Sequence, residues 1–214
     1  MNFTICTAEQ RSAEWFTARL GKFTASSASD MLATIKSGEA AARRDLRMRL
    51  VLERLTGQSQ ESGYINADMQ WGMDHEVDAF AAYEAHSGNL VRRTGFLSHV
   101  EFMAGCSLDG DVEHFAGIVE IKAPKSATHY GYLKARAVPA NHLPQILHQL
   151  WITGAQWCDF CSYDPRFPEP LQLFVARVPR VEIDVLAYEK TALKFLAEVD
   201  AEMDAAQALM CVGA

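Results

Sequence analysis

The sequence predicts an α/β fold in which a mixed β-sheet is flanked by helices. Three observations support this prediction. Long amphipathic segments fill the first 88 residues, short turn-bounded apolar segments follow between 90 and 124, and helical and strand-like segments then alternate. The chain has 214 residues, of which 49% are hydrophobic, so it can bury a substantial core. We expect a single domain over residues 1–214.

The first part of the chain reads as helical. Segment 12–21 places Ala13, Phe16 and Leu20 on one stripe and ends at a glycine. Segment 24–35 opens with small hydroxyl residues that are typical of an N-cap. Longer amphipathic helices are expected over 39–57 and 68–88, and each ends at a glycine.

The pattern then changes to short apolar runs bounded by turns. Segments 90–100, 102–113 and 116–124 predict three consecutive strands, and Pro124 ends the last of them. Helices are expected at about 126–136 and 140–153, strands at 156–164 and 171–180, and a long helix at about 181–209. This order is typical of an α/β domain.

Composition limits the possible functions. The formal net charge of −7 argues against a general nucleic-acid binder, so any DNA contact should be local to a cleft. The sequence has no run of 18 apolar residues, and its first 15 residues lack the features of a signal peptide, so we expect a cytoplasmic protein with no membrane contact.

Five cysteines, an odd number, suit reduced thiols better than a disulfide framework. Cys158 and Cys161 form a CxxC motif within a predicted strand, where positions three apart face opposite sides. No further metal ligands follow at short spacing, which favours buried thiols over a zinc or iron–sulfur site.

Two opposite charges interrupt the apolar strand GIVEIK (117–122). The two-residue period of a strand places Val119 and Ile121 on one face and Ile118, Glu120 and Lys122 on the other. The simplest explanation is a solvent-facing strand that carries a Glu–Lys pair.

Asp109, in the preceding hairpin, offers another explanation. It points away from its neighbour Leu108 and can therefore face the same cleft as Glu120. Adjacent antiparallel strands lie about 4.8 Å apart, so the two carboxylates would repel and a pKa would rise. A divalent cation removes this penalty, and hard oxygen ligands favour Mg²⁺ or Mn²⁺ over Zn²⁺. Lys122 would then hold or activate an attacking water. A D…ExK match alone is common by chance.

Glu76 also stands out, because Met73, Phe80 and Tyr83 are its neighbours on a helical face. A carboxylate there requires a metal or a buried partner, unless it lies at the edge of the stripe and reaches water.

Arg19 precedes a glycine turn, and Ser26 lies near the start of a helix. An arginine, a hydroxyl and free backbone N–H groups would suit a phosphate, although an ordinary capped helix has the same features.

Together these stretches resemble the phage lambda exonuclease family, the YqaJ-type viral recombinases within the PD-(D/E)xK nucleases. The resemblance covers about residues 10–167. It rests on ordered motifs: WFTARLGKFTAS, WGMDHE, CSLDG, VEIKAP and LPQILHQLWITG, followed by SYDPRF. It implies a restriction-endonuclease-like core and a Mg²⁺-dependent, ATP-independent 5′-to-3′ exonuclease. Such an enzyme would act on linear double-stranded DNA and leave 3′ single-stranded overhangs.

The resemblance also implies roles for individual residues. Asp109 and Glu120 match metal-binding carboxylates, the Ile121 carbonyl matches a backbone ligand, and Glu76 matches a carboxylate near a second Mg²⁺, with Mn²⁺ as a possible substitute. Lys122 matches the catalytic lysine. The residues that match DNA contacts are Arg19 at the 5′-phosphate with Ser26 beside it, Trp15 near the DNA end, Met69 as an apolar wedge, Lys36 near the groove, and Gln145. A second polar residue of the family near Gln145 is replaced here, and Gln149 is a candidate to supply that contact.

The implied setting is phage or prophage recombination in a bacterial host, with a homotrimeric ring around DNA and a single-strand annealing protein as partner. Two alternatives remain. One is a RecB-type or CRISPR-adaptation-type nuclease with an iron–sulfur cluster, for which Cys158 and Cys161 are the only indication. The other is a non-catalytic DNA-end-binding recombination scaffold.

Overall fold

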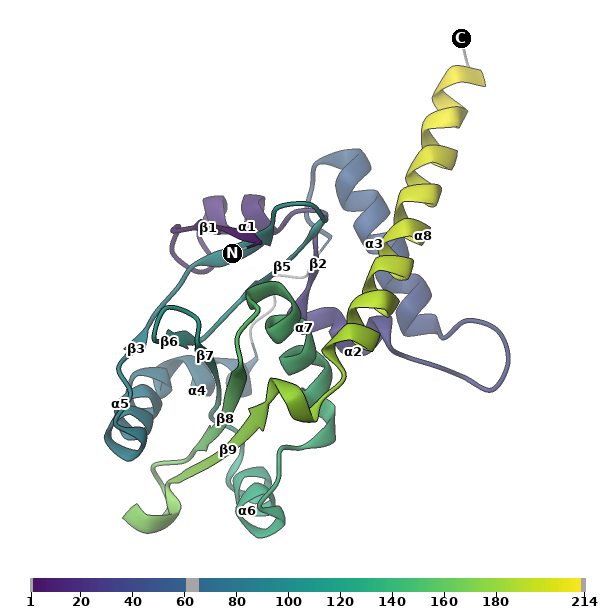
Figure 1. Ribbon diagram of the computed structural model, residues 1–214. Helices are drawn as coiled ribbons and strands as arrows, with labels where there is room; N and C mark the ends of the chain where they lie inside the picture. The colour runs from purple at the N-terminus through teal and green to yellow at the C-terminus, as the bar shows by residue number, and fades with distance from the viewer. Residues whose placement is uncertain (1, 61–65, 213–214) are drawn as a thin grey trace.

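The structure is a computed structural model that describes residues 2–60 and 66–212. It contains two β-sheets with helices packed around them (Figure 1), which confirms the predicted α/β class. Two sheets are present in the described residues where the sequence predicted one, and the functional residues depend on how these sheets are joined.

The smaller sheet has the strand order β1-β4-β5-β2. Its strands are β1 (Phe3–Cys6), β4 (Phe96–His99), β5 (Ala104–Ser107) and β2 (Phe23–Thr24). β4 pairs antiparallel with β1 and β5, whereas β2 runs parallel to β5. The prediction that the first part of the chain is purely helical is therefore wrong at β1 and β2. These strands have four and two residues, too few for a two-residue period to stand out.

The larger sheet has the order β3-β6-β7-β8-β9 and is mixed, since β7 and β8 are parallel and the other pairs are antiparallel. Its strands are β3 (Val91–Arg92), β6 (Gly110–Val112), β7 (Gly117–Lys122), β8 (Trp157–Tyr163) and β9 (Leu173–Pro179). The strands expected over 116–124, 156–164 and 171–180 are confirmed as β7, β8 and β9.

The other two predicted strands are each divided between the sheets. Segment 90–100 forms β3 and β4, and segment 102–113 forms β5 and β6. The chain passes from β3 to β4 at Gly95, where an added Cβ would lie 1.7 Å from the carbonyl oxygen of Cys6. Only glycine fits this approach to the neighbouring chain, so the turn here is fixed by packing and not by the strand pattern.

Eight α-helices occur in the described residues, and none is long and apolar enough to cross a membrane. They are α1 (Ala13–Arg19), α2 (Ala28–Met31), α3 (Ala41–Thr56), α4 (Ala67–Asp74), α5 (Glu76–Ser87), α6 (Ser126–Ala135), α7 (Leu143–Thr153) and α8 (Val185–Val212). Left-handed glycines end α3 and α5 as expected, and Gly154 ends α7 in the same way.

Two helix predictions need correction. The helix expected over 68–88 is two helices, because the chain breaks at His75 between α4 and α5. In α1, Trp15 is the buried residue, whereas Phe16 is exposed. The Trp15 indole donates a hydrogen bond to Ser107 Oγ at 3.1 Å, so a tertiary contact sets the orientation of this short helix.

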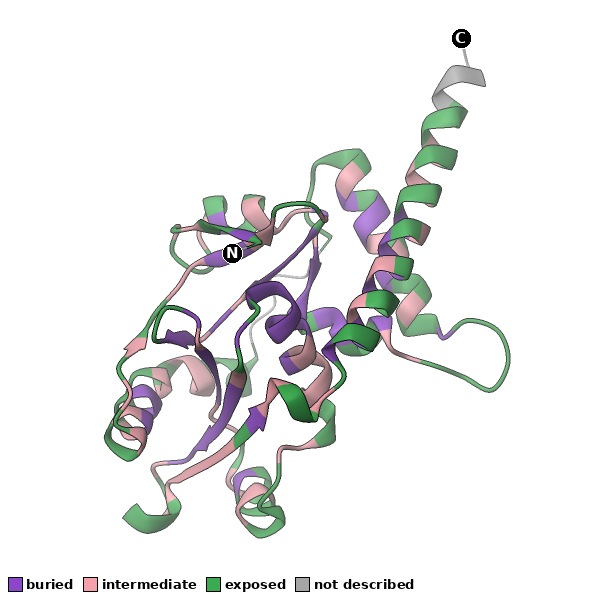
Figure 2. Ribbon diagram, viewed as in Figure 1, coloured by how far each residue is buried: buried purple, intermediate pink, exposed green. Residues whose placement is uncertain are grey.

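α7 joins the two sheets. It contacts β4 and β5 of the smaller sheet, β8 of the larger sheet, and α8. In Figure 2 most of α7 and the neighbouring strands are buried, whereas α8 is largely exposed over residues 201–209. Ile118 belongs to the main core with α7, and Val119 and Ile121 belong to a second core under α5. The predicted alternation of faces along this strand is confirmed.

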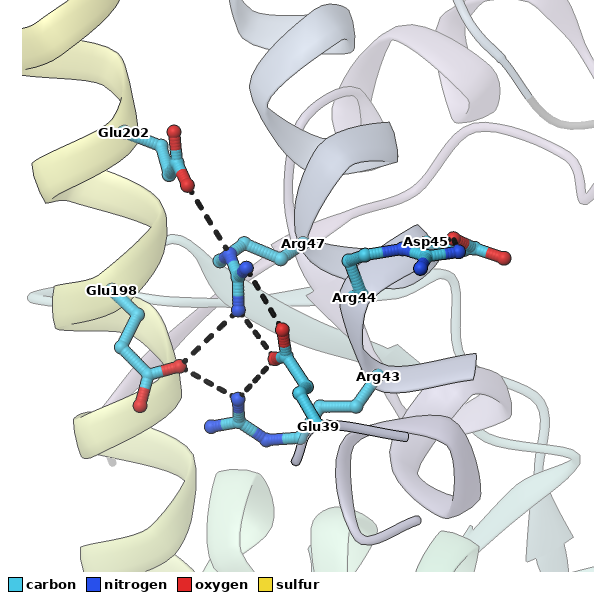
Figure 3. A network of polar contacts seen from close by, with 7 residues as sticks. All are labelled: Glu39, Arg43, Arg44, Asp45, Arg47, Glu198 and Glu202. Atoms are coloured by element: carbon cyan, nitrogen blue, oxygen red, sulfur yellow. Dashed lines mark hydrogen bonds and ion pairs between the residues drawn. The ribbon is translucent and has the colours of Figure 1, made fainter. Parts of the chain in front are cut away.

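An ion-pair network holds α3, α8 and the end of the loop before α3 together (Figure 3). Glu39 and Glu198 each accept from Arg43 at 2.7 Å. Arg47 pairs with Glu39 and lies 3.7 Å from both Glu198 and Glu202. Exposed pairs contribute only about 0–1 kcal/mol each, so the value of this network lies in fixing the geometry of both helices.

Candidate active site

The β6–β7 hairpin brings the two predicted carboxylates together. Gly110 is paired with Val119, so Asp109, one residue earlier, lies across from Glu120. Asp109 Oδ2 accepts a hydrogen bond from the backbone N–H of Ile121 at 2.6 Å. The expectation that Asp109 and Glu120 share one site therefore agrees with the strand register.

Glu120 is 1% exposed and is held by side chains from α7. Gln145 Nε2 donates to Oε1 at 2.7 Å, and Gln149 Nε2 donates to Oε2 at 2.6 Å. Lys122 forms an ion pair with the same carboxylate. Gln145 and Gln149 therefore hold the two oxygens of one carboxylate. A buried carboxylate needs such partners, since leaving it unpaired would be costly.

Burial and charge shift the pKa values of two site residues. Burial raises the pKa of Asp109, and the charge of Glu120 raises it further. Burial alone would lower the pKa of Lys122, but the charges of Glu120 and Asp109 raise it above its ordinary value. Lys122 is therefore an ammonium group at neutral pH, whereas the raised pKa of Asp109 means that its ionised form is unfavourable there unless a cation stabilises it.

The oxygen atoms of this cluster suit a divalent cation with few protein ligands. An ionised carboxylate has about four acceptor positions. On Glu120, three of these positions accept from Gln145, Lys122 and Gln149. On Asp109, one position accepts from the backbone N–H of Ile121. Within residues 2–60 and 66–212, no three His, Cys, Asp or Glu side chains form a metal-binding group. Mg²⁺ is usually bound by one or two carboxylates and several waters, so the donor set fits Mg²⁺ and does not resemble a zinc site.

Glu76 is the first residue of α5, directly after the break at His75. Its side chain is 32% exposed and lies 3.9 Å from the Arg93 guanidinium. Because α4 and α5 are separate helices, Met73 and Glu76 do not share one continuous helical face as the sequence suggested. Glu76 instead lines the same cavity as Asp109.

Two adjoining cavities form a cleft over the carboxylates. The first cavity has a volume of about 390 Å³, and Ile121 and Lys122 form part of its wall. The second has a volume of about 450 Å³ and contains Trp15 and Ser107. Five residues line both cavities: Gln10, Arg11, Met73, Glu76 and Asp109. These shared residues make the cavities one continuous depression, and Asp109 lies at the junction.

Of the three residues expected at the 5′-phosphate and the DNA end, Trp15 lines the cleft, whereas Arg19 and Ser26 line neither of its cavities. Trp15 is in the wall of the second cavity, and the Arg19 guanidinium stacks on the Trp15 ring at 4.2 Å from its centre. Ser26 is exposed and lies 3.2 Å from the hydroxyl of Thr24. Arg19 therefore contacts Trp15 directly. Within the described residues, the hydrogen bond found for Ser26 is the local one to Thr24.

The other predicted DNA contacts are also separated. Met69 in α4 is 45% exposed and lines the first cavity, so it is not a core residue. Lys36 lies in the exposed loop between α2 and α3. The Gln145 amide is bonded to Glu120, so this residue orients a carboxylate.

Sequence reasoning missed three residues of the cleft. Gln10 and Arg11 line both cavities, and Tyr132 lines the first cavity with its hydroxyl 3.3 Å from Nε2 of His142. Gln10 and Arg11 lie in the connection between β1 and α1, where no periodic pattern marks them. The only signal in Tyr132 is an aromatic residue on a helix, which is more often a core residue.

Cys158 and Cys161 are both buried, in the main core and in the second core respectively. They therefore lie on opposite faces of β8, as the strand period predicted, and cannot bind one cluster together. The same geometry gives no support to an iron–sulfur nuclease.

Comparisons with known proteins agree with this architecture. An alkaline exonuclease from Laribacter hongkongensis, LHK-Exo, is 36% identical and has a TM-score of 0.83, with 95% of this chain and 100% of that chain covered. The same exonuclease in complex with dAMP gives a TM-score of 0.84 at the same identity and coverage. No curated protein sequence matches the chain.

A phage-related exonuclease from Haemophilus somnus is 16% identical with a TM-score of 0.62, over 85% of this chain and 96% of that one, and supports the fold alone. The fold is that of the PD-(D/E)xK nucleases. Residues 14–156, well over half of the sequence, match the YqaJ-like viral recombinase domain. The chain therefore belongs to the YqaJ-like viral recombinase family.

Proposed function

We propose that this protein is a Mg²⁺-dependent, ATP-independent exonuclease that degrades linear double-stranded DNA from 5′ to 3′ and leaves 3′ single-stranded overhangs for phage-type recombination. The observation that carries the proposal is the cluster of Asp109, Glu120 and Lys122 on one hairpin, in which Asp109 and Lys122 line the cleft and Glu120 is buried behind them. The 36% identity to an alkaline exonuclease supports the same reaction class.

The metal-binding residues would be Asp109, Glu120 and the carbonyl of Ile121, with Glu76 near a second ion. Mg²⁺, or Mn²⁺ in its place, would lower the pKa of a bound water and neutralise charge on the phosphate. Gln145 and Gln149 hold Glu120 in one orientation, which fixes the donor set before substrate arrives. Lys122, as an ammonium, would orient the attacking water by hydrogen bonding and stabilise developing negative charge.

The DNA would lie along the cleft. Arg19 and Ser26 would receive the 5′-phosphate, and Trp15, stacked on Arg19, would pack near the DNA end. Met69 would act as an apolar wedge between the separating strands, since opening a base pair costs a few kcal/mol that contacts with freed bases offset. Lys36, on its exposed loop, would approach the groove.

The proposed assembly is a homotrimeric ring around DNA, and the proposed partner is a single-strand annealing protein in a bacterial host that carries the phage or prophage. A ring is compatible with the net charge of −7, because only the inner surface needs basic groups.

One time course tests the reaction. Linear duplex DNA labelled at either its 5′ or its 3′ end is digested with Mg²⁺, beside Glu120→Ala and a reaction with EDTA. We expect early release of the 5′ label by the wild type only with Mg²⁺, and no release by Glu120→Ala. Early release of the 3′ label would refute the polarity, and release in EDTA would refute metal dependence.

Two variants test the residue roles. Lys122→Ala should abolish cleavage and retain duplex binding, and full activity of this variant would contradict the proposal. Arg19→Ala should reduce the preference for 5′-phosphorylated ends. Equal losses on phosphorylated and unphosphorylated ends would mean that Arg19 does not receive the phosphate.

A further inference from the structure

Arg11 lies at the junction of the two cavities that form the cleft. It belongs to the connection between β1 and α1 and lines both cavities together with Glu76 and Asp109. A chain that passes from one cavity to the other must therefore pass Arg11. Asp109, the proposed metal-binding residue, marks the same point.

Other basic side chains that line the cleft or lie next to it in sequence already have acidic partners: Lys122 lines the first cavity, Arg93 lines the second, and Lys125 follows the lining residue Pro124. Lys122 is paired with Glu120, Arg93 lies 3.9 Å from Glu76, and Lys125 lies 3.0 Å from Asp68. Arg11 is exposed, and it forms no ion pair with any residue in 2–60 or 66–212. It is therefore the cation of the cleft that is available to a ligand.

The backbone of Arg11 provides an independent observation. Its φ is +73°, in the left-handed region that favours glycine and is uncommon for a long side chain. Strained backbone of this kind persists only where the surrounding structure holds it, and it occurs often at functional sites. Glycine would remove the strain at this position, at the expense of the guanidinium.

We propose that Arg11 binds a backbone phosphate of the DNA strand where that strand crosses from one cavity to the other. This inference rests on the proposed function, since it assumes a DNA strand in the cleft. A guanidinium can form two parallel hydrogen bonds to phosphate oxygens, which would set the position of the strand next to Asp109. A chain with a net charge of −7 needs such local contacts to hold a polyanion.

The test separates the side chain from the backbone strain. Arg11→Gly removes both, whereas Arg11→Lys keeps a positive charge without the planar fork. Arg136→Gly is a matched control, because Arg136 is also an exposed arginine with positive φ, at +49°, and it ends α6 without lining either cavity. Duplex binding is measured by fluorescence anisotropy in EDTA between 50 and 200 mM salt, and unfolding is measured by heating.

For Arg11→Gly we expect weaker binding, a salt dependence whose slope is smaller by about 0.9, and an unchanged or higher melting temperature. Arg11→Lys should keep most of the salt slope, and Arg136→Gly should keep the slope and the affinity of the wild type. Wild-type affinity and slope in Arg11→Gly would overturn the proposal. A loss of affinity together with a lower melting temperature would also overturn it, because the role would then be structural.

The two proposals fail in different ways. If the wild type neither binds duplex DNA nor releases nucleotides with Mg²⁺, the proposed function is refuted and the role of Arg11 with it. If the wild type does both while Arg11→Gly matches it in affinity and salt slope, only the role of Arg11 is refuted.

Discussion

His148, in the middle of α7, makes stability depend on pH in a way that can be calculated. It is completely buried, with Nε2 3.0 Å from the carbonyl oxygen of Gly105 and Nδ1 2.8 Å from the hydroxyl of Tyr188. A carbonyl only accepts, so Nε2 carries the proton and donates, and Nδ1 accepts from Tyr188. The imidazole is therefore satisfied in its neutral form. Burial lowers the pKa of His148 to about 3.

The direction of the pH effect follows from this pKa. In the unfolded chain a histidine titrates at about pH 6.5, so below that pH the unfolded state binds a proton that the folded state does not. The contribution of His148 to stability is complete above pH 6.5 and is lost as the pH falls towards 3. A pH of 5 is roughly 1.5 units below the pKa of a histidine in the unfolded chain, and this difference lowers the free energy of unfolding by about 2 kcal/mol.

Urea unfolding at pH 5 and pH 8 measures this loss, with His148→Gln as the comparison. Glutamine cannot titrate, but its amide can donate to Gly105 and accept from Tyr188. We expect the wild type to lose about 2 kcal/mol more than His148→Gln between pH 8 and pH 5. Equal losses in the two proteins would show that His148 titrates as in the unfolded chain, and the reasoning from burial would be wrong.

Three further predictions concern packing and charge. Arg166→Ala should lower stability by about 1–3 kcal/mol in thermal unfolding, because it removes the two guanidinium hydrogen bonds that help to hold the pKa of buried Asp164 at about 2; an unchanged melting temperature would contradict this. Glu198→Gln should lower the free energy of urea unfolding by at most about 1 kcal/mol, and 1 M salt should abolish the difference from the wild type; a loss independent of salt would mean that packing, not charge, is affected. Gly95→Ala should lower the free energy of unfolding by about 3 kcal/mol or more, or prevent folding, as judged by circular dichroism. Gly72→Ala is the control and should be tolerated, because a Cβ at Gly72 meets no atom within 4 Å. A stable Gly95→Ala protein would show that the chain can move away from Cys6.

The larger sheet and the proposed catalytic residues could be predicted because a strand period specifies faces. Two-residue alternation placed Glu120 and Lys122 on one side of β7, and hairpin geometry placed Asp109 opposite them. Gln145 and Gln149 could be anticipated only as polar residues in or near a motif. Their pairing with Glu120 depends on how α7 packs across β7, which is a tertiary contact.

The division into two sheets could not be predicted, since it depends on close contacts and not on local pattern. Segment 90–100 reads as one apolar run, but the approach of Gly95 to Cys6 turns it from one sheet into the other. Arg11 was equally hidden, because a left-handed arginine in a short connection has no sequence signature. At Gly95 and at Arg11, the backbone conformation is decided by the space that residues distant in sequence leave.

The contribution of His148 to stability and the orientation of the Glu120 carboxylate are connected through α7. Gln145 and Gln149 are four residues apart and present their amides to the same carboxylate on β7, while His148 binds Gly105 on the smaller sheet. The position of the two amides therefore depends on how firmly α7 is held against β5. Protonation of His148 would remove the acceptor for Tyr188 and place a charge in the core. Acid should consequently disturb the orientation of Glu120 through α7, in addition to any protonation of the carboxylates themselves.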